Sequence, residues 1–336
     1  MRIHNSGQLY LMITVFLAAT GIAQDGHRTF SYGFDELKGV SKSSHSIGSA
    51  AIITDVRRAI AHQDFALADS EIQAYRSQNG LTPEVLEALS WMGRGALAAR
   101  NYSQAASYAQ LVQKLAIEQL QKRRLDAEGH LPIALGAAIE VQAQVLAAQG
   151  ERSEAEAFLR RELKTYYDTS LRARIQKNIN LVALEGNAAP AFDTAEYLGP
   201  KPPPLASLGG KVVLLFFWAH WCADCKAEAS VLERVNADYG SRLMLIGPTQ
   251  RYGYGANGDE ATPAEELKYI DAVRLKYYGH IAGMPVPVSE DAFKTYGAST
   301  TPTLVLIDRS GVVRMYHPGR MTYEELKPKI DKVLST

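Results

Sequence analysis

The stretch VVLLFFWAHWCADC, at residues 212–225, joins an unbroken apolar run to two cysteines three positions apart. The run from Val212 to Trp218 contains no polar residue, which is typical of a strand buried on both faces of a sheet. Residues 223–239 follow with apolar side chains at helical spacing. The sequence therefore predicts that Cys222 and Cys225 lie where a buried strand ends and a helix begins.

That position favours thiol chemistry. A cysteine with an ordinary pKa of about 8.5 is mostly protonated at neutral pH, and a helix N-terminus stabilises its thiolate. We therefore predict that Cys222 is the exposed nucleophile and Cys225 the resolving thiol, with a mixed disulfide on Cys222 as the intermediate. A structural staple is one alternative, but so small a loop gains little entropy. A metal site would need two further ligands, which no nearby motif supplies. We expect no metal and no cofactor.

The composition limits the kind of protein that this can be. A chain of 336 residues with 46% hydrophobic residues can form two cores, since domains usually contain about 100 to 200 residues. Its 36 basic and 36 acidic residues balance, so we expect no nucleic-acid partner. Only two cysteines occur, which excludes a scaffold of several disulfides and a four-cysteine zinc site.

The first residues are typical of an export signal. Arg2 and His4 precede an apolar run at residues 9–23, which is shorter than the about 20 residues that a spanning helix needs. We predict a cleaved signal peptide at residues 1–23 and a linker at 24–48. An uncleaved membrane anchor and a buried helix are the alternatives, and only the anchor would bring the protein to a membrane. Either targeting role places the protein in the periplasm or another oxidising compartment.

Residues 49–185 predict an all-helical domain, because they are rich in helix-forming residues with apolar positions at helical spacing. Similar segments recur at 61–68, 98–105 and 148–155, each with a polar turn followed by an alanine where the next helix must approach closely. Their starts, 37 and then 50 residues apart, resemble degenerate tetratricopeptide repeats, which are helical hairpins of about 34 residues. An irregular helical bundle is the alternative. Stacked hairpins would offer a docking surface for a protein partner.

A second domain is predicted at residues 186–336, where the composition changes. The prolines at 202–204 cannot continue a helix or a central strand, so they predict a loop. From residue 211 onward, strand-like and helix-like segments alternate, which predicts an α/β domain with a central mixed sheet. We predict strands at 212–218, 242–247, 303–307 and 312–316 and helices at 223–239, 263–278, 291–296 and 321–334.

Residues from about 187 to 336 resemble the TlpA/ResA-type thioredoxin-like family of exported thiol:disulfide oxidoreductases. The helix at 263–278 and residues 284–288 match the family's central insertion. The resemblance implies a thioredoxin fold, disulfide exchange with a protein client, and an upstream electron donor. It is carried by APAF at 189–192, LGGKVVLLFFW at 208–218, WCADC at 221–225 and TPTLVLID at 301–308.

The resemblance also implies which residues contact the client. Pro302 would follow a cis bond from Thr301 and face the cysteines, leaving nearby backbone groups free to pair with the client in a β-like manner. An ordinary trans turn is the alternative. Trp221 would flank the site, and Trp218 would either flank it or belong to the core.

Glu228 matches an acidic residue that members of this family often carry six positions after the first cysteine. It lies three residues beyond Cys225 and hence on the same helix face. If burial raises its pKa, this carboxyl group could hold the proton of the resolving thiol. A solvated surface charge is the alternative. The acid that thioredoxins carry six positions before the first cysteine is replaced here by Phe216.

Two residues near the cysteines are predicted to tune their redox potential. The family often has proline directly before the second cysteine, where this chain has Asp224. An anion about 6 Å from the Cys222 sulfur would raise the thiol pKa by roughly one unit and so favour the disulfide. The sequence therefore predicts a reducing protein. A charged His220 would act in the opposite direction.

Two other functions remain as alternatives. A peroxiredoxin-like peroxidase shares the fold and an exposed cysteine, but its pattern usually has Thr or Ser where this chain has Ala219. A client-binding or assembly protein would use the helical domain, with redox activity in a secondary role. The second alternative is compatible with thiol chemistry at Cys222.

Overall fold

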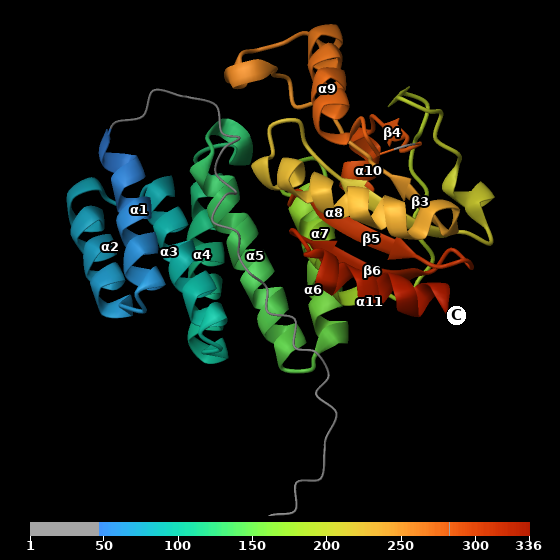
Figure 1. The fold of residues 1–336 in the computed structure, drawn as a ribbon. Helices are drawn as coiled ribbons and strands as arrows, with labels where there is room; N and C mark the ends of the chain where they lie inside the picture. The colour runs from blue at the N-terminus through green and yellow to red at the C-terminus, as the bar shows by residue number, and fades with distance from the viewer. Residues whose placement is uncertain (1–46, 282) are drawn as a thin grey trace, which may run out of the picture. The chain divides into compact units, whose positions relative to one another are not determined.

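The computed structural model describes residues 47–281 and 283–336 (Figure 1). The predicted signal peptide and nearly all of the predicted linker lie outside the described residues. From Ile47 to Ala183 the described chain is helical, as the composition predicted, with one short 3-10 turn at Leu125–Ala127. Its helices are α1 (Ile47–Ala61), α2 (Phe65–Asn79), α3 (Pro83–Ala98), α4 (Tyr102–Leu120), α5 (His130–Ala148), α6 (Arg152–Thr165) and α7 (Arg172–Ala183).

The three similar segments of the sequence adopt similar turns. In each, a residue with positive φ comes directly before the N-cap residue of the next helix. These pairs are Gln63–Asp64, Arg100–Asn101 and Gly150–Glu151. The aligned alanines Ala68, Ala105 and Ala155 are each 0% exposed, because a neighbouring helix packs closely against them. The three segments are therefore equivalent in backbone conformation and in burial.

Helix α5 lies at the centre of the helical region, in contact with α3, α4, α6 and α7. In the described part of the chain, α5 is the one helix that is apolar and long enough to cross a membrane. Neighbouring elements bury 61% of its most apolar stretch, as is usual for a core helix. Its buried Glu140 lies 2.7 Å from Arg174 Nε and 3.3 Å from Lys177 Nζ. Burial raises the pKa of Glu140, but these two cations outweigh it and hold the pKa well below its usual range.

A four-stranded sheet forms the centre of the second half of the chain. Strand β2 (Val212–Phe217) is parallel to β3 (Leu243–Ile246) and antiparallel to β5 (Thr303–Ile307), so the sheet is mixed, as predicted. The antiparallel strand β6 (Val313–Pro318) completes the order β3-β2-β5-β6. The prolines at 202–204 lie in a loop, as predicted.

The helices of this half coincide closely with the predicted ranges. They are α8 (Ala223–Tyr239), α9 (Pro263–Tyr278), α10 (Glu290–Thr295) and α11 (Tyr323–Leu334). Two-residue strands β1 (Tyr197–Leu198) and β4 (Val286–Pro287) pair outside the main sheet and were not predicted, because so short a pair leaves no alternating pattern in the sequence.

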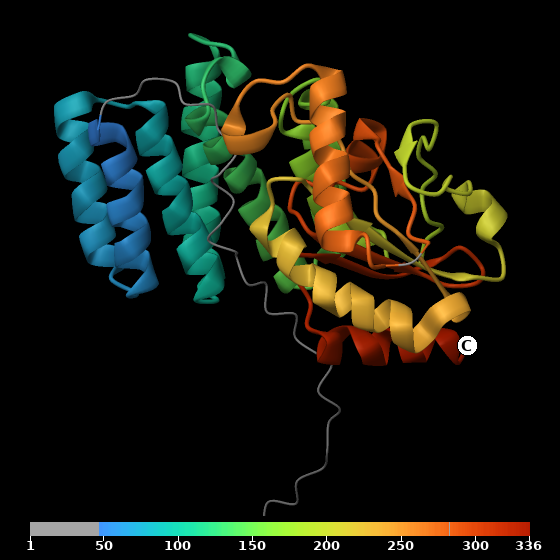
Figure 2. The ribbon, with the colours of Figure 1, turned by 45° about the horizontal axis from the view of Figure 1, so that its top comes forward.

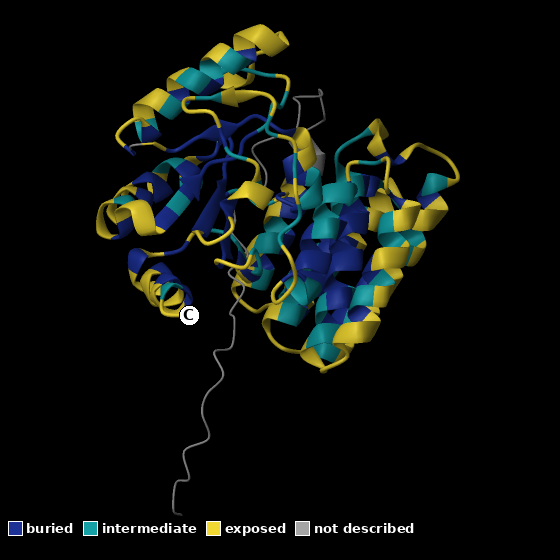
Figure 3. Ribbon diagram, turned by 90° about the vertical axis from the view of Figure 1, so that its right-hand side faces the viewer, coloured by how far each residue is buried: buried dark blue, intermediate teal, exposed yellow. Residues whose placement is uncertain are grey.

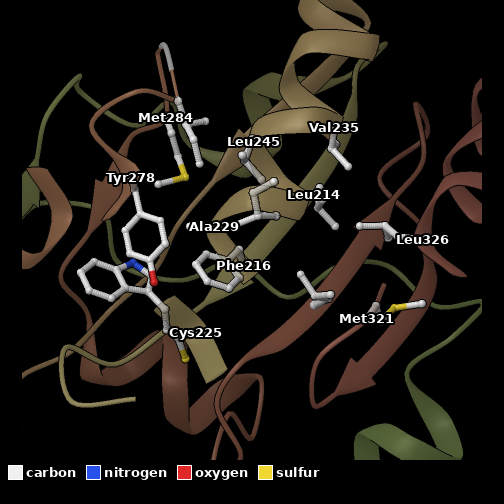
Figure 4. Close-up of a cluster of buried hydrophobic side chains, with 14 of the residues drawn as sticks. Leu214, Phe216, Cys225, Ala229, Val235, Leu245, Tyr278, Met284, Met321 and Leu326 are labelled. Carbon is white, nitrogen blue, oxygen red and sulfur yellow. The ribbon is translucent and has the colours of Figure 1, made fainter. Parts of the chain in front are cut away.

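Side chains of β2 alternate between two cores. Leu214 and Phe216 point into the core formed with α8, α9 and α11 (Figure 4), whereas Leu215 and Phe217 point to the opposite face, against α10. Helices α8 and α11 lie side by side on one face of the sheet (Figure 2). The sheet is buried between these layers (Figure 3), which explains why β2 has no polar position.

Helix α7 contributes to both halves of the chain. Ile175 and Ile179 are buried with the other helices, whereas Leu184, just beyond the helix end, is buried with Leu215 and Phe217 of the sheet. The Glu185 carboxylate accepts a hydrogen bond from the Tyr316 N–H of β6 at 3.0 Å. The domain boundary near residue 186 stays a prediction, but the chain directly before it already belongs to the core of the second half.

Candidate active site

The two cysteines lie at the start of α8 and form a disulfide bond. Cys222 is the N-cap residue with an extended backbone, and its sulfur accepts a hydrogen bond from the Cys225 N–H at 3.0 Å. The positive end of the helix is thus directed at the Cys222 sulfur, which favours a thiolate there after reduction. Cys222 is 5% exposed and Cys225 0%, so Cys222 is the accessible partner but is far less exposed than we expected.

The segment before β5 covers the Cys222 sulfur. The Thr301–Pro302 peptide bond is cis, as the family resemblance implied, and the Thr301 carbonyl oxygen lies 3.3 Å from the Cys222 sulfur. Within residues 47–281 and 283–336, the Thr301 N–H has no hydrogen-bond partner. A backbone donor is therefore available next to the sulfur that a client would approach.

Glu228 is fully buried beneath the disulfide, one helical turn beyond Cys225. Burial raises the pKa of Glu228 to about 7. A hydrogen bond from the Met321 N–H at 3.3 Å and the nearby Arg320 lower the pKa, but they offset only part of the effect of burial. The alternative of a solvated charge is therefore wrong. At position 216 the chain has no acid, and the Phe216 ring packs 5.5 Å from that of Tyr278.

Arg320 is a site residue that the sequence did not indicate. Its guanidinium lies 3.5 Å from the buried Glu228 carboxylate and 3.6 Å from that of Asp224, whose side chain is 41% exposed. The cation offsets part of the negative charge that Asp224 brings to the motif, so the effect of Asp224 on the Cys222 thiol is smaller than an isolated anion would give. Arg320 follows β6, far from the motif in sequence, and no local pattern marks it.

His220 is buried rather than exposed beside the cysteines. Burial lowers the pKa of His220 below its ordinary value. The Glu266 carboxylate, 3.1 Å from His220 Nε2, acts in the opposite direction but does not outweigh burial. Rings of Tyr252, Tyr254 and Tyr269 surround it, with centroids 5.3 to 5.6 Å away. The imidazole is therefore neutral near pH 7, and the condition under which His220 would offset Asp224 is not met.

Glu266 of α9 is the second site residue that the sequence analysis missed. Besides facing His220, it accepts backbone hydrogen bonds from Tyr252 at 2.5 Å and Gly253 at 2.9 Å. One buried carboxylate thus connects the segment before Cys222 to the loop after β3. Its only sequence signal was an acidic residue in the first turn of α9, which is common at helix N-termini.

The two tryptophans have different surroundings. Trp218 is 0% exposed and its indole N–H donates to the Gly247 carbonyl at 2.9 Å, so it belongs to the core. Trp221 is half-buried next to Cys222, and its ring lies 5.5 Å from Tyr252. In the described ranges, no three His, Cys, Asp or Glu side chains come together as a metal site would require.

This geometry agrees with the similarity to known proteins. Residues 205–334 match the family described as a thioredoxin-like domain. The C-terminal part of the chain that contains these residues is a thioredoxin-like domain. The thioredoxin-like protein YneN of Bacillus subtilis is 27% identical over 148 residues, which cover 44% of this chain and 79% of YneN. The thiol-disulfide oxidoreductase ResA of Bacillus thuringiensis is 28% identical over 150 residues, which cover 44% of this chain and 78% of ResA.

A solved structure is also similar to the thioredoxin-like domain. The putative thiol:disulfide interchange protein DsbE from Chlorobium tepidum is 24% identical, covers 45% of this chain and 97% of its own, and has a TM-score of 0.35. Each of these matches covers less than half of the chain.

Proposed function

We propose that this protein is an exported thiol:disulfide oxidoreductase of the TlpA/ResA type that acts on a protein client. The observation that carries the proposal is the Cys222–Cys225 pair at the N-terminus of α8, next to the Thr301 N–H, which has no hydrogen-bond partner among the residues that the structure describes. Relatives named thiol-disulfide oxidoreductase support it. The predicted signal peptide at residues 1–23 supports a periplasmic or otherwise exported location.

In the reducing direction, the Cys222 thiolate attacks one sulfur of the client disulfide and the client's other sulfur leaves as a thiolate. Cys225 then attacks the Cys222 sulfur of the mixed disulfide. This step releases the second client thiol and forms the Cys222–Cys225 disulfide, so two electrons pass to the client. Glu228, with a pKa of about 7, accepts the proton of Cys225 during this attack. An upstream donor returns the pair to the dithiol.

Client binding involves the residues that surround the sulfur. Thr301 offers its backbone N–H to the client chain, Pro302 fixes the direction of that segment, and Trp221 supplies an aromatic contact. The helical region at 49–185 is built from degenerate tetratricopeptide-like hairpins that dock the client, a proposal supported by its three equivalent turns and buried alanines.

The preferred direction of electron flow is reduction of the client. Asp224 lies within the motif and disfavours the thiolate, although Arg320 at 3.6 Å weakens this effect. His220, neutral at pH 7, adds no positive charge. A midpoint potential near that of thioredoxin, about −270 mV, supports this direction, whereas a potential near the about −120 mV of a strong periplasmic oxidant contradicts it.

Trapping with Cys225→Ser tests the proposed function. In this variant the mixed disulfide on Cys222 cannot resolve, so a covalent complex with the client accumulates in the exported fraction and mass spectrometry identifies its partner. The matched variant Cys222→Ser should trap nothing. Absence of a trapped protein, together with wild-type reductase activity of Cys225→Ser, would overturn the assigned roles. Rapid consumption of hydrogen peroxide without disulfide reduction would favour a peroxidase.

A further inference from the structure

A pocket of about 550 Å³ lies beside the cysteine pair. Trp221 and Thr301, which flank Cys222, form part of its lining, together with Tyr252 and Phe293. Its other wall comes from the helical half of the chain, through the turn before α7 and the first turn of that helix at residues 167–173. The reacting sulfur is thus next to a pocket that the thioredoxin-like domain alone does not complete.

The helical wall is held in place by buried contacts. A Cβ atom on Gly297 would lie 2.1 Å from the Lys177 backbone nitrogen, so the two backbones are in direct contact. Lys177 Nζ lies 3.3 Å from Thr300 Oγ1 and 3.3 Å from Glu140 of α5. The same helix that forms the wall therefore packs against the segment that carries Thr301 and Pro302.

The lining is suited to an uncharged chain with an aromatic or aliphatic side chain. Lys294 and Glu290 pair with each other at 2.7 Å, and the Arg172 guanidinium lies over the Tyr167 ring, 3.9 Å from its centroid. Three of the four charged side chains in the lining are therefore already engaged, and the fourth, Asp168, would repel an acidic client. Tyr167 is 47% exposed and presents an aromatic surface, which is the kind of side chain that anchors binding interfaces.

We propose that this pocket binds the residues that flank the reacting cysteine of the client, in an extended, uncharged segment with an aromatic or aliphatic residue against Tyr167. The inference rests on the proposed function and adds a substrate preference, set by the helical half of the chain. The Thr301 N–H pairs with the client backbone near its cysteine, and the adjoining client side chain enters the pocket.

Peptide disulfides test the preference in the full-length protein. The probes are cystine and the disulfide-linked dimers of Gly-Phe-Cys-Phe-Gly and Gly-Glu-Cys-Glu-Gly. We expect wild-type protein to reduce the phenylalanine peptide with a higher kcat/KM than the glutamate peptide. Tyr167→Ala should lower kcat/KM for the phenylalanine peptide about tenfold, mainly through KM, which corresponds to about 1.4 kcal/mol. Its activity on cystine and its midpoint potential should not change.

Tyr197→Ala is the matched control, because Tyr197 is 38% exposed and does not line the pocket. A second variant, Ala173→Arg, places a long charged side chain in the first turn of α7 and should also reduce activity on the phenylalanine peptide alone. If Ala173→Arg loses activity on cystine, its fold is damaged. The comparison of Tyr167→Ala with Tyr197→Ala then tests the pocket proposal by itself. Equal peptide preference in wild type, Tyr167→Ala and Tyr197→Ala overturns the pocket proposal. Failure of the wild type to reduce any of the three probes contradicts the proposed function instead.

Discussion

Glu228 brings an ionisable group into an apolar core, and this has a consequence for stability. Its native pKa of about 7 lies above the ordinary value of 4.5, so the native state favours the protonated acid. Its contribution to stability is fully present below pH 4.5 and is lost as the pH rises through 7. The difference between the native and ordinary pKa values corresponds to about 3 kcal/mol of unfolding free energy between low and high pH.

Urea unfolding of the oxidised protein measures this effect, because disulfide-bonded cysteines do not titrate. We expect the unfolding free energy of the wild type to fall between pH 5 and pH 8 by about 2.5 kcal/mol more than that of Glu228→Gln, whose amide cannot ionise. Other titrating groups, including His220, are common to both proteins and cancel in the comparison. Parallel pH profiles for the two proteins would show that Glu228 titrates normally.

Single residues differ in how far the sequence could reveal them. Cys222 and Cys225 were found from their spacing after an apolar run, and Glu228 from the family resemblance together with its helical offset, since each signal lies in one short segment. Arg320 and Glu266 act on these residues from distant segments, and a single sequence contains no record of such contacts. The burial of His220 was missed for the same reason, because its cage is formed by the loop after β3 and by α9.

Helix α9 stabilises the catalytic segment through Glu266. Its buried carboxylate accepts hydrogen bonds from the backbone of Tyr252 and Gly253 and faces His220. Glu266→Ala leaves these buried groups unpaired, and we expect a loss of about 3 kcal/mol or more in the free energy of unfolding. Chemical denaturation at pH 7 provides the measurement.

The chain offers a matched control for this substitution. Glu233 also faces a histidine, His280, at 3.4 Å, but their side chains are 59% and 41% exposed. Glu233→Ala should cost less than about 1 kcal/mol, since exposed ion pairs contribute little. Equal losses for the two variants would mean that the Glu266 contacts contribute nothing beyond a surface pair.

The sequence predicted the secondary-structure elements best where a long segment also has a clear pattern of buried apolar residues. The ranges 223–239, 263–278 and 303–307 coincide with α8, α9 and β5. Strand β2 ends one residue before the predicted end. The Trp218 N–H donates to the Pro248 carbonyl at 3.1 Å and the Trp218 carbonyl accepts from the Thr249 hydroxyl at 2.9 Å, so this residue pairs with the loop after β3 and not with a strand. Tertiary contacts of this kind set the ends of elements, and they do not follow from periodicity.

At the scale of the whole molecule, α7 makes the helical region and the thioredoxin-like domain depend on each other. Ile179 is buried in one core, Leu184 in the other, and Gly297 contacts the α7 backbone without room for a Cβ. We therefore expect the described chain to unfold in one cooperative transition, with far-ultraviolet circular dichroism and tryptophan fluorescence changing together.

Gly297→Ala should break this dependence. The substitution places a Cβ 2.1 Å from the Lys177 nitrogen at a residue with φ of 58°, so backbone strain adds to a collision that only a shift of α7 can relieve. Gly311→Ala is the control, since Gly311 also has positive φ but nothing lies within 4 Å of the added atom, and it should cost only about 1 to 2 kcal/mol. Separate thermal transitions of helix content and fluorescence in Gly297→Ala, with coincident ones in Gly311→Ala, would establish α7 as the coupling element. Coincident transitions with equal losses in both variants would contradict it.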